Sequence, residues 1–170
     1  AEALLYAADR AHHIATVVRP ALARGAVVLA DRYLDSSVAY QGVARDLGLK
    51  EVRDLSLWAT DGFMPSLTLL LDVPVSVGAG RVGGTQDRIE AAGTAFHQAV
   101  RDEYLKLANE DPQRWCVIDA KGSVDDVAVQ LEVHQAVGIA ARHCAQDRYV
   151  LGHLLADRRP RRTAGITRRQ

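Results

Sequence analysis

The sequence predicts a layered α/β fold with a parallel sheet. Three short apolar runs have the length and composition of buried strands: residues 26–30, 67–71 and 115–118. Segments with the apolar spacing of helices separate these runs, and strands that alternate with helices indicate a parallel sheet. Each run is followed by or ends at an aspartate: Asp31, Asp72 and Asp119. Ligands of such sheets bind beyond the carboxyl ends of the strands, so we expect a site there.

The first helical pattern covers residues 1–24 and stops at Gly25. The apolar residues at helical spacing are Leu4, Leu5, Ala8, Ala11, Ile14, Ala15, Val18 and Leu22. Pro20 lies inside the pattern and has no N–H to donate, so we expect a kink or break near Arg19. The run 26–30 that follows is continuous and rich in valine, which predicts a strand buried on both faces.

The remaining elements follow from the same periodicities. In order, we expect helices over 35–46 and 48–61 with a stop near Gly62, a buried strand over 67–71, a glycine-rich mobile loop over 78–87, a helix over 89–107, a strand over 115–118 and an amphipathic helix over 123–139. Residues 157–170 are rich in arginine and have little to bury, so we expect a solvated, disordered tail. The sequence therefore predicts one domain over 1–139 and a C-terminal extension over 140–170.

Composition narrows the class of protein. The chain has 170 residues, a hydrophobic content of 48% and a formal net charge of zero. These values suit one ordinary domain and argue against a surface that binds nucleic acid or anionic membrane as a whole. No apolar run is long enough to span a bilayer. Cys116 and Cys144 have no metal-ligand spacing, so reduced thiols in the cytoplasm are the simplest interpretation.

The pair Asp31-Arg32 follows the first predicted strand. An arginine at a strand's carboxyl end can direct two N–H groups onto a phosphate. The adjacent aspartate could hold that arginine, position magnesium or accept a proton. The alternative is a strand-end salt bridge without a ligand, which the dipeptide alone favours.

A cluster of hydrogen-bonding residues comes next: Ser36, Ser37, Tyr40 and Gln41. Such a set suits the edge of a nucleobase and its sugar, although serines after a strand are often helix caps. In the first helix, Tyr6 and Arg10 are one turn apart and point the same way. A ring beside a guanidinium suits a base and its carbonyl, although such a pair taken alone is more often an ordinary surface contact.

The glycine-rich stretch carries Arg81, Asp87 and Arg88. Glycines supply hinges, so this stretch suits a lid that brings positive charge to transferring phosphates. A plain connecting loop is the alternative, and the residues themselves do not separate the two.

Together these residues resemble the thymidylate kinase family. The strings "LLYAADRAHH", "PALARGAVVLADRYLDSSVAYQG", "LSLWATDGFMPSLTLLLDVP", "DRIEAAG" and "VIDA" occur in the family's order, over roughly residues 1–138. The resemblance implies a three-layer parallel sheet of the P-loop nucleoside-monophosphate kinase type that lacks its first strands. It also implies phosphoryl transfer from ATP to dTMP giving dTDP, with Mg²⁺, in a cytoplasmic homodimer.

On the acceptor side, the resemblance implies that Tyr6 stacks on thymine and that Arg10 hydrogen-bonds the base carbonyl. Ser37 and Gln41 fall where the family reads the other edge of the base. Tyr40 falls where a ring crowds the sugar and disfavours a 2′-hydroxyl.

For the phosphates, the resemblance implies that Arg32 clamps the dTMP phosphate and that Asp31 organises the magnesium. Arg81 and Arg88 belong to the lid over ATP, which is shorter and less basic than in members whose lid supplies the catalytic arginine. The loop Ala120, Lys121 and Gly122 resembles the family's adenine-contacting loop. No side-chain nucleophile is implied.

One family feature is missing. Thymidylate kinases bind the donor phosphates with a glycine-rich loop ending in Lys-Ser/Thr, and no G-x-x-x-x-G-K-[ST] occurs in the 170 residues. The resemblance implies that this loop lies upstream, so we expect an N-terminal truncation and an isolated chain without activity.

The same resemblance places the upstream strand between the strands 26–30 and 67–71. A buried amide without a partner costs roughly 1–3 kcal/mol, against a typical stability of about 5–15 kcal/mol. We therefore expect a marginal or aggregation-prone chain, or a rearrangement in which these two strands pair directly.

Two further functions stay open at this point. One is a non-catalytic nucleotide-binding or interaction protein that keeps only the dTMP pocket. The other is a related nucleoside-monophosphate kinase. Competition between dTMP, dUMP and UMP tests it, because crowding of the sugar by Tyr40 predicts that UMP binds worst. The arginine-rich tail allows weak nucleic-acid binding as a minor function.

Overall fold

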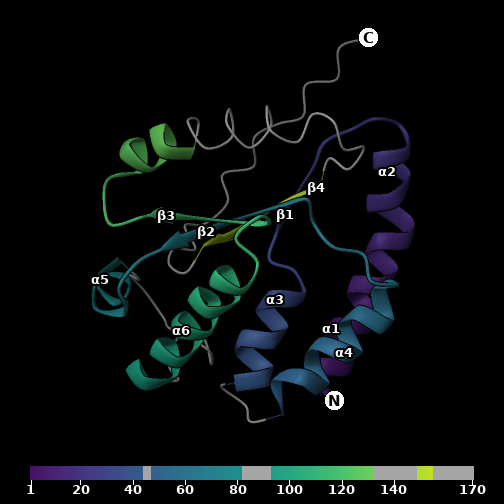
Figure 1. The fold of residues 1–170 in the computed structure, drawn as a ribbon, viewed down its shortest axis with the longest axis horizontal. Coiled ribbons are helices and arrows are strands. Elements are labelled where there is room, and N and C mark those ends of the chain that lie inside the picture. The colour runs from purple at the N-terminus through teal and green to yellow at the C-terminus, as the bar shows by residue number, and fades with distance from the viewer. Residues whose placement is uncertain (44–46, 82–92, 132–148, 155–170) are drawn as a thin grey trace.

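The computed structural model of the chain describes residues 1–43, 47–81, 93–131 and 149–154. Within these residues the sheet has four strands in the order β1-β4-β2-β3 (Figure 1). They are β1 Val28–Asp31, β2 Leu67–Asp72, β3 Trp115–Asp119 and β4 Tyr149–Leu154. Every pair of neighbours runs parallel, which confirms the predicted α/β fold with a parallel sheet.

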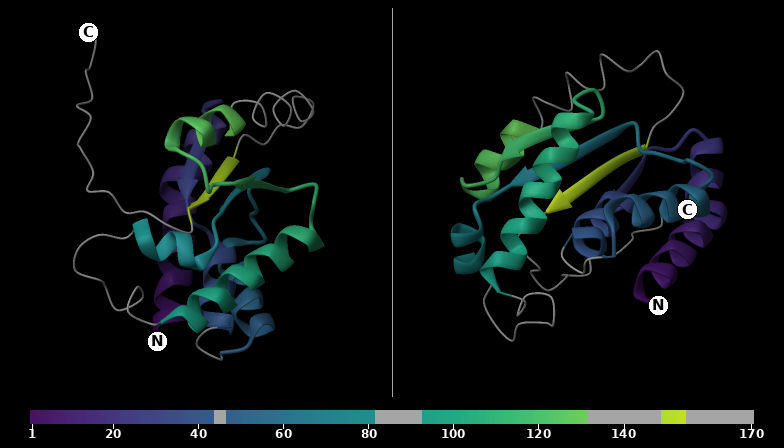
Figure 2. Two further views of the ribbon diagram at one scale, coloured as in Figure 1. Left: turned by 90° about the vertical axis from the view of Figure 1, so that its left-hand side faces the viewer. Right: turned by 60° about the horizontal axis from the view of Figure 1, so that its bottom comes forward.

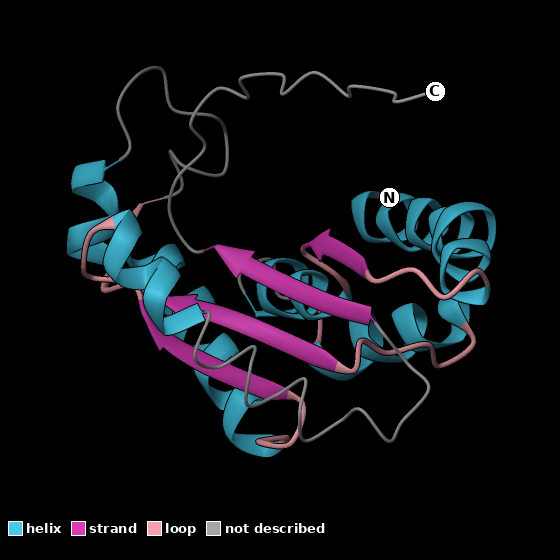
Figure 3. Ribbon diagram, turned by 90° about the horizontal axis from the view of Figure 1, so that it is seen from above, coloured by secondary structure: helices cyan, strands magenta, loops and turns pink. Residues whose placement is uncertain are grey.

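Strand β4 comes from the C-terminal extension, where the sequence predicts no strand. It pairs with β1 on one side, Val28 opposite Tyr149, and with β2 on the other, Leu67 opposite Val150. Figure 3 shows the strands side by side with β4 inside the sheet. The expectation that β1 and β2 pair directly is therefore wrong, because β4 lies between them and hydrogen-bonds the backbone of both.

One face of the sheet packs against helices α3 and α6, with α1 and α4 side by side beyond α3 (Figure 2). These helices are α1 Glu2–His13, α3 Leu34–Ser37, α4 Leu49–Thr60 and α6 Thr94–Glu110. The core on this face includes Leu70 of β2, Tyr104 of α6 and Trp115 of β3. The apolar spacing of α6 predicted this packing, although the helix begins at Thr94 and residues 89–92 lie outside the described residues.

A second, smaller core lies on the opposite face of the sheet. There Leu67, Leu69 and Ile118 pack against Val127 and Leu131. The last two belong to a helical segment over 124–131, the first part of the helix predicted over 123–139. Alternate residues of β2 thus enter opposite cores, as the twofold repeat of a strand requires.

Strand β1 is not buried on both faces, contrary to expectation. Val28 and Ala30 pack against the main core, whereas Leu29 is 74% exposed. Leu29 lies on the face opposite the main core, because successive side chains of a strand point to opposite faces. A valine-rich run indicates a strand, but it does not tell whether both faces are covered.

The first helical pattern forms three consecutive elements: α1, the π-helical segment η1 Ile14–Val18 and α2 Arg19–Ala23. The expected irregularity thus occurs in the turn before Arg19, where Pro20 cannot continue the regular hydrogen bonding. Ile14 and Val18 are buried as expected, but Leu4 and Leu5 are exposed. The buried residue of α1 is Ala7, so the face of this helix that packs on the core is not the one that carries Leu4 and Leu5.

The helix predicted over 35–46 is α3 followed by the π-helical segment η2 Val38–Val43. The glycine-rich stretch is partly helical, because α5 Val75–Arg81 takes its first residues. Predictions that fall on 44–46, 82–92, 132–148 and 155–170 lie outside the described residues, including Asp87, Arg88, Cys144 and the arginine-rich tail. In the part of the chain that is described, no helix is long and apolar enough to cross a membrane.

Candidate functional site

The three predicted aspartates stand where the sequence places them. Asp31, Asp72 and Asp119 are the last residues of β1, β2 and β3. Parallel strands end at one edge of the sheet, so these carboxylates mark the edge at which ligands of α/β sheets bind.

Arg32 follows Asp31 with a φ of 67°, in the left-handed region. Residues other than glycine rarely adopt this conformation, and it is concentrated at functional sites. The guanidinium carbon of Arg32 lies 5.1 Å from the centre of the Tyr40 ring, within the range of a cation–π contact. The sharp backbone turn thus directs Arg32 from the sheet edge over one of the predicted substrate residues.

The guanidinium of Arg32 stays protonated in this position. Burial lowers the pKa of its guanidinium, but interactions with Tyr40, Tyr104 and Asp31 raise it by more, so the pKa lies above its ordinary value. A permanent cation at a strand end suits a phosphate, as the sequence predicts.

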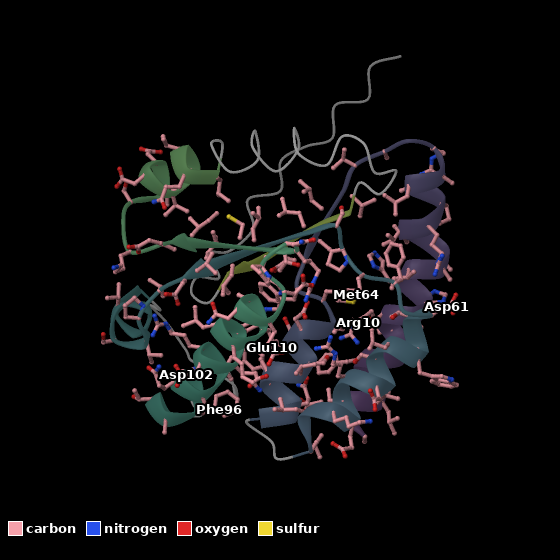
Figure 4. The ribbon with its side chains drawn as sticks, in the orientation of Figure 1. Arg10, Asp61, Met64, Phe96, Asp102 and Glu110 are labelled. Carbon is pink, nitrogen blue, oxygen red and sulfur yellow. The ribbon has the colours of Figure 1, made fainter. Side chains whose placement is uncertain are left out.

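Helix α1 is joined by hydrogen bonds to the segment that contains Ser37 and Gln41. Arg10 donates from one terminal nitrogen to the Ser37 hydroxyl at 2.7 Å and from the other to the Ser56 hydroxyl at 3.3 Å. Gln41 donates from its side-chain nitrogen to a carboxylate oxygen of Glu2 at 3.0 Å. The structure therefore brings together three predicted substrate residues, Arg10, Ser37 and Gln41. Figure 4 shows Arg10 among helices α1, α3 and α4.

Tyr6 lies between these two attachments. Glu2, Tyr6 and Arg10 are spaced by four residues along α1, so their side chains project from the same side of the helix. Tyr6 is 45% exposed, which leaves much of its ring accessible. Its position beside Arg10 is the arrangement expected for a ring that stacks on a base.

Tyr40 is 8% exposed and belongs to a row of rings that reaches into the core. Its ring centre lies 6.1 Å from that of Phe96 and 6.4 Å from that of Tyr104. The Tyr104 hydroxyl lies 2.7 Å from the Ser36 hydroxyl, one of the polar groups of the predicted cluster. Ser36 thus hydrogen-bonds to a core tyrosine. The Tyr104 ring in turn packs against Tyr40, the ring that Arg32 contacts.

The strongest contact that the sequence did not reveal joins Asp35 and Arg114. Arg114 donates to both carboxylate oxygens of Asp35, at 2.9 and 3.0 Å, and also to the Thr68 hydroxyl at 3.0 Å. The Asp35 side chain is 2% exposed and that of Arg114 is 11% exposed. The only sequence signal was the acidic residue at an apolar position of the helix after Asp31-Arg32.

A second unpredicted ion pair holds the end of β2. Arg101 of α6 donates to the two carboxylate oxygens of Asp72 at 2.7 and 2.8 Å. This hydrogen bonding raises the pKa of Arg101 above its ordinary value. Asp72 is therefore engaged in fixing α6 against the sheet.

The loop after β3 contains the predicted adenine-contacting residues. Ala120 donates from its backbone N–H to the Asp72 carbonyl at 2.8 Å, which places the loop beside the end of β2. The Lys121 ammonium lies 2.9 Å from a carboxylate oxygen of Asp119, and hydrogen bonds from the Lys121 side chain and backbone lower the pKa of Asp119. The loop thus sits at the ligand-binding edge, while its contact with adenine stays a prediction.

Two predicted residues are not tested by the geometry. Arg81 is the last residue of α5, but its side chain lies outside the described residues, as does all of Arg88. Among the described residues no group of three or more metal-ligating side chains converges. Asp31 is therefore not part of a converging set of three or more ligands within the described residues.

A parallel sheet with polar and charged residues gathered at the carboxyl ends of its strands defines an α/β protein of the ligand-binding kind. A sequence model of the thymidylate kinase family matches residues 1–131. This chain therefore belongs to the thymidylate kinase family, which confirms the resemblance found in the sequence.

Individual relatives agree with the family match. A protein named thymidylate kinase from Leifsonia xyli subsp. xyli is 58% identical over 134 residues, which are 77% of this chain and 63% of the relative. Another from Clavibacter sepedonicus is 54% identical over 144 residues, 83% of this chain and 68% of the relative. One from Bifidobacterium longum is 48% identical over 132 residues, 78% of this chain and 64% of the relative. The chain thus spans about two thirds of the length of these relatives.

Proposed function

We propose that this chain forms the dTMP-binding side of a thymidylate kinase, which transfers the γ-phosphoryl group of ATP to dTMP and gives dTDP. The observation that carries the proposal is the double attachment of α1 to the segment 37–41, through Arg10–Ser37 and Glu2–Gln41. It joins helix α1, which carries Tyr6 and Arg10, to the segment that carries Ser37 and Gln41, and the family resemblance assigns these four residues to the base.

In this proposal the base and the phosphate are held by different elements. The ring of Tyr6 stacks on thymine and Arg10 donates to a base carbonyl, while Ser37 and Gln41 address the other edge. Tyr40 packs against the sugar. Arg32, which lies over Tyr40 at the end of β1, donates to the dTMP phosphate and neutralises charge as the phosphoryl group is transferred.

Magnesium and ATP belong to the proposal as partners of the whole protein. Mg²⁺ in kinases is usually held by one or two carboxylates together with substrate phosphates, and the single carboxylate of Asp31 fits that requirement. The metal would neutralise charge on the transferring phosphate. Ala120, Lys121 and Gly122 are proposed to contact adenine, and Arg81 and Arg88 to act from the lid.

The fuller fold and assembly are also proposals. We expect the complete three-layer sheet of the nucleoside-monophosphate kinases, and a homodimer for which the exposed Leu4 and Leu5 of α1 offer an apolar surface. A cytoplasmic location would keep the Cys116 thiol reduced.

Binding without catalysis is the second candidate function, since the proposed dTMP-binding residues Tyr6, Arg10 and Arg32 all lie within these 170 residues. Calorimetric titration of the chain with dTMP and ATP separately, beside a coupled assay of ADP release, distinguishes the two. We expect dTMP binding without ADP release by the 170 residues. Turnover by this chain would exclude a purely binding role, and lack of dTMP binding would overturn both candidates.

A further inference from the structure

The hydrogen bond between Gln41 and Glu2 fixes which way the Gln41 amide points. Gln41 is 5% exposed and its side-chain nitrogen lies 3.0 Å from a carboxylate oxygen of Glu2. An ionised carboxylate only accepts hydrogen bonds, so it must face the NH₂ end of the amide and not the carbonyl end. Since the two polar atoms of an amide diverge from the carbon that joins them, the Gln41 oxygen is turned away from Glu2.

Arg10 presents the opposite polarity on the same side of α1. Its guanidinium carries only donors and is placed by the hydroxyls of Ser37 and Ser56. Glu2 and Arg10 project from the same side of the helix, with Tyr6 between them. The chain therefore offers a donor from Arg10 and, at a separate position, an acceptor from the Gln41 oxygen.

This order of donor and acceptor distinguishes between pyrimidines. Thymine and uracil carry an acceptor oxygen at C4 next to the N3–H donor, whereas cytosine carries an amino donor at C4 next to an N3 acceptor. A 4-oxo ring would place its oxygen against the guanidinium and its N3–H against the Gln41 oxygen. Cytosine would place donor against donor and acceptor against acceptor.

We propose that Glu2 is a specificity-determining residue, which holds the Gln41 amide in the orientation that accepts from N3–H of a 4-oxopyrimidine and excludes cytosine. Glu2 acts through Gln41 and is a positioning residue. The inference rests on the proposed function, because it presumes that the base of dTMP lies beside Tyr6.

The test compares the affinities of dTMP and dCMP by calorimetry. In Glu2→Gln the carboxylate becomes an amide that can donate or accept, so the Gln41 amide is able to turn over. We expect the ratio of the dTMP and dCMP affinities to fall roughly 10- to 100-fold, the effect of one or two mispaired buried groups. dUMP should follow dTMP, since it has the same polarity at C4 and N3.

The matched control is Glu51→Gln. Glu51 lies in the first turn of α4 as Glu2 lies in the first turn of α1, so both variants remove one negative charge near a helix N-terminus. The control should leave the ratio unchanged. Thermal unfolding of both variants separates loss of selectivity from loss of structure.

A second variant keeps the test decisive if Glu2→Gln does not fold. Gln41→Ala should lower the same ratio, and adding Glu2→Gln to it should change the ratio no further, because Glu2 acts only through Gln41. An unchanged ratio in Glu2→Gln, or a further fall in the double variant, would overturn the inference while leaving the proposed function intact. Failure of the unaltered chain to bind dTMP would overturn the proposed function, and this inference with it.

Discussion

Arg114 donates two hydrogen bonds to the carboxylate of Asp35, and this pair ties the start of β3 to helix α3. Asp35 comes three residues after Arg32, so the pair anchors the segment that carries Arg32, Ser37 and Tyr40. Removing one member of a buried ion pair leaves the other charge without compensation. The Asp35–Arg114 pair is therefore expected to hold the site segment in place.

Replacing Arg114 with methionine tests this anchor. Because the Asp35 carboxylate would stay buried without its cation, the free energy of unfolding should fall by about 3–5 kcal/mol. Chemical denaturation measures the change. Lys50→Met, which breaks the exposed pair of Lys50 and Asp54 on α4, is the control and should cost less than about 1 kcal/mol. Equal losses in the two variants would contradict the assigned role.

The hydroxyl pair of Tyr104 and Ser36 should also be measurable. Tyr104 is 1% exposed, so Tyr104→Phe removes a buried hydrogen bond and is expected to lower the free energy of unfolding by about 1–3 kcal/mol. Ser36→Ala should cost a similar amount. The double variant should lose less free energy of unfolding than the sum of the two single losses, because both substitutions remove the same hydrogen bond. Fully additive losses would show that the two hydroxyls do not interact.

Strand β4 gives a prediction about the backbone. Leu151 pairs with Ala30 of β1 and with Thr68 of β2, so a proline there would interrupt an interior strand. Leu151→Pro should lower the free energy of unfolding by about 3 kcal/mol or more. Val124→Pro serves as the control, since Val124 follows the capping residue Ser123 and proline is tolerated in a first helical turn. If both variants unfolded at the same temperature as the unaltered chain, β4 would not be part of the native sheet.

Alkaline pH provides a test of the buried phenol. Burial raises the pKa of Tyr104 above its ordinary value of 10.0, so folding favours the protonated form. The stabilisation is fully present below pH 10 and is lost as the pH rises toward the higher pKa of the folded state. We expect the free energy of unfolding to fall above about pH 10, and to fall less steeply in Tyr104→Phe. Ultraviolet titration that ionised every tyrosine near pH 10 without unfolding would contradict this.

Part of the arrangement around the candidate site follows from local patterns in the sequence. Arg10, Ser37 and Gln41 stand out because polar residues gather after a strand and one turn apart on a helix, and the structure brings these three together. Such local patterns depend only on neighbours in the chain. The relation between Tyr6 and Arg32 stays a prediction, because each is placed by a different element.

What the sequence could not reveal depends on pairing over long distances. Arg114 follows Asp35 by 79 residues, and nothing near either residue indicates its partner. Strand β4 lies in the C-terminal extension, where the sequence predicts no strand, and its place inside the sheet depends on pairing with β1 and β2, which are far away in the chain. The exposure of Leu29 has the same origin, because a valine-rich run carries no information on whether a helix covers it.

The central claim is that Arg32 and the residues around Tyr6 hold the two ends of one dTMP molecule. Calorimetric titration of the unaltered chain, Arg32→Lys and Arg19→Lys with dTMP tests it directly. Arg19 is the control because it makes the same kind of contact as Arg32: its guanidinium carbon lies 5.0 Å from the centre of the Phe63 ring. Tyr6 is near the start of the first helical pattern, whereas Arg19 is near its end. Lysine keeps the charge and loses the two-pronged geometry that suits phosphate.

We predict binding of one dTMP per chain, weakened roughly tenfold or more in Arg32→Lys and unchanged in Arg19→Lys. Binding that is absent from the unaltered chain, or that weakens equally in both variants, would contradict the account.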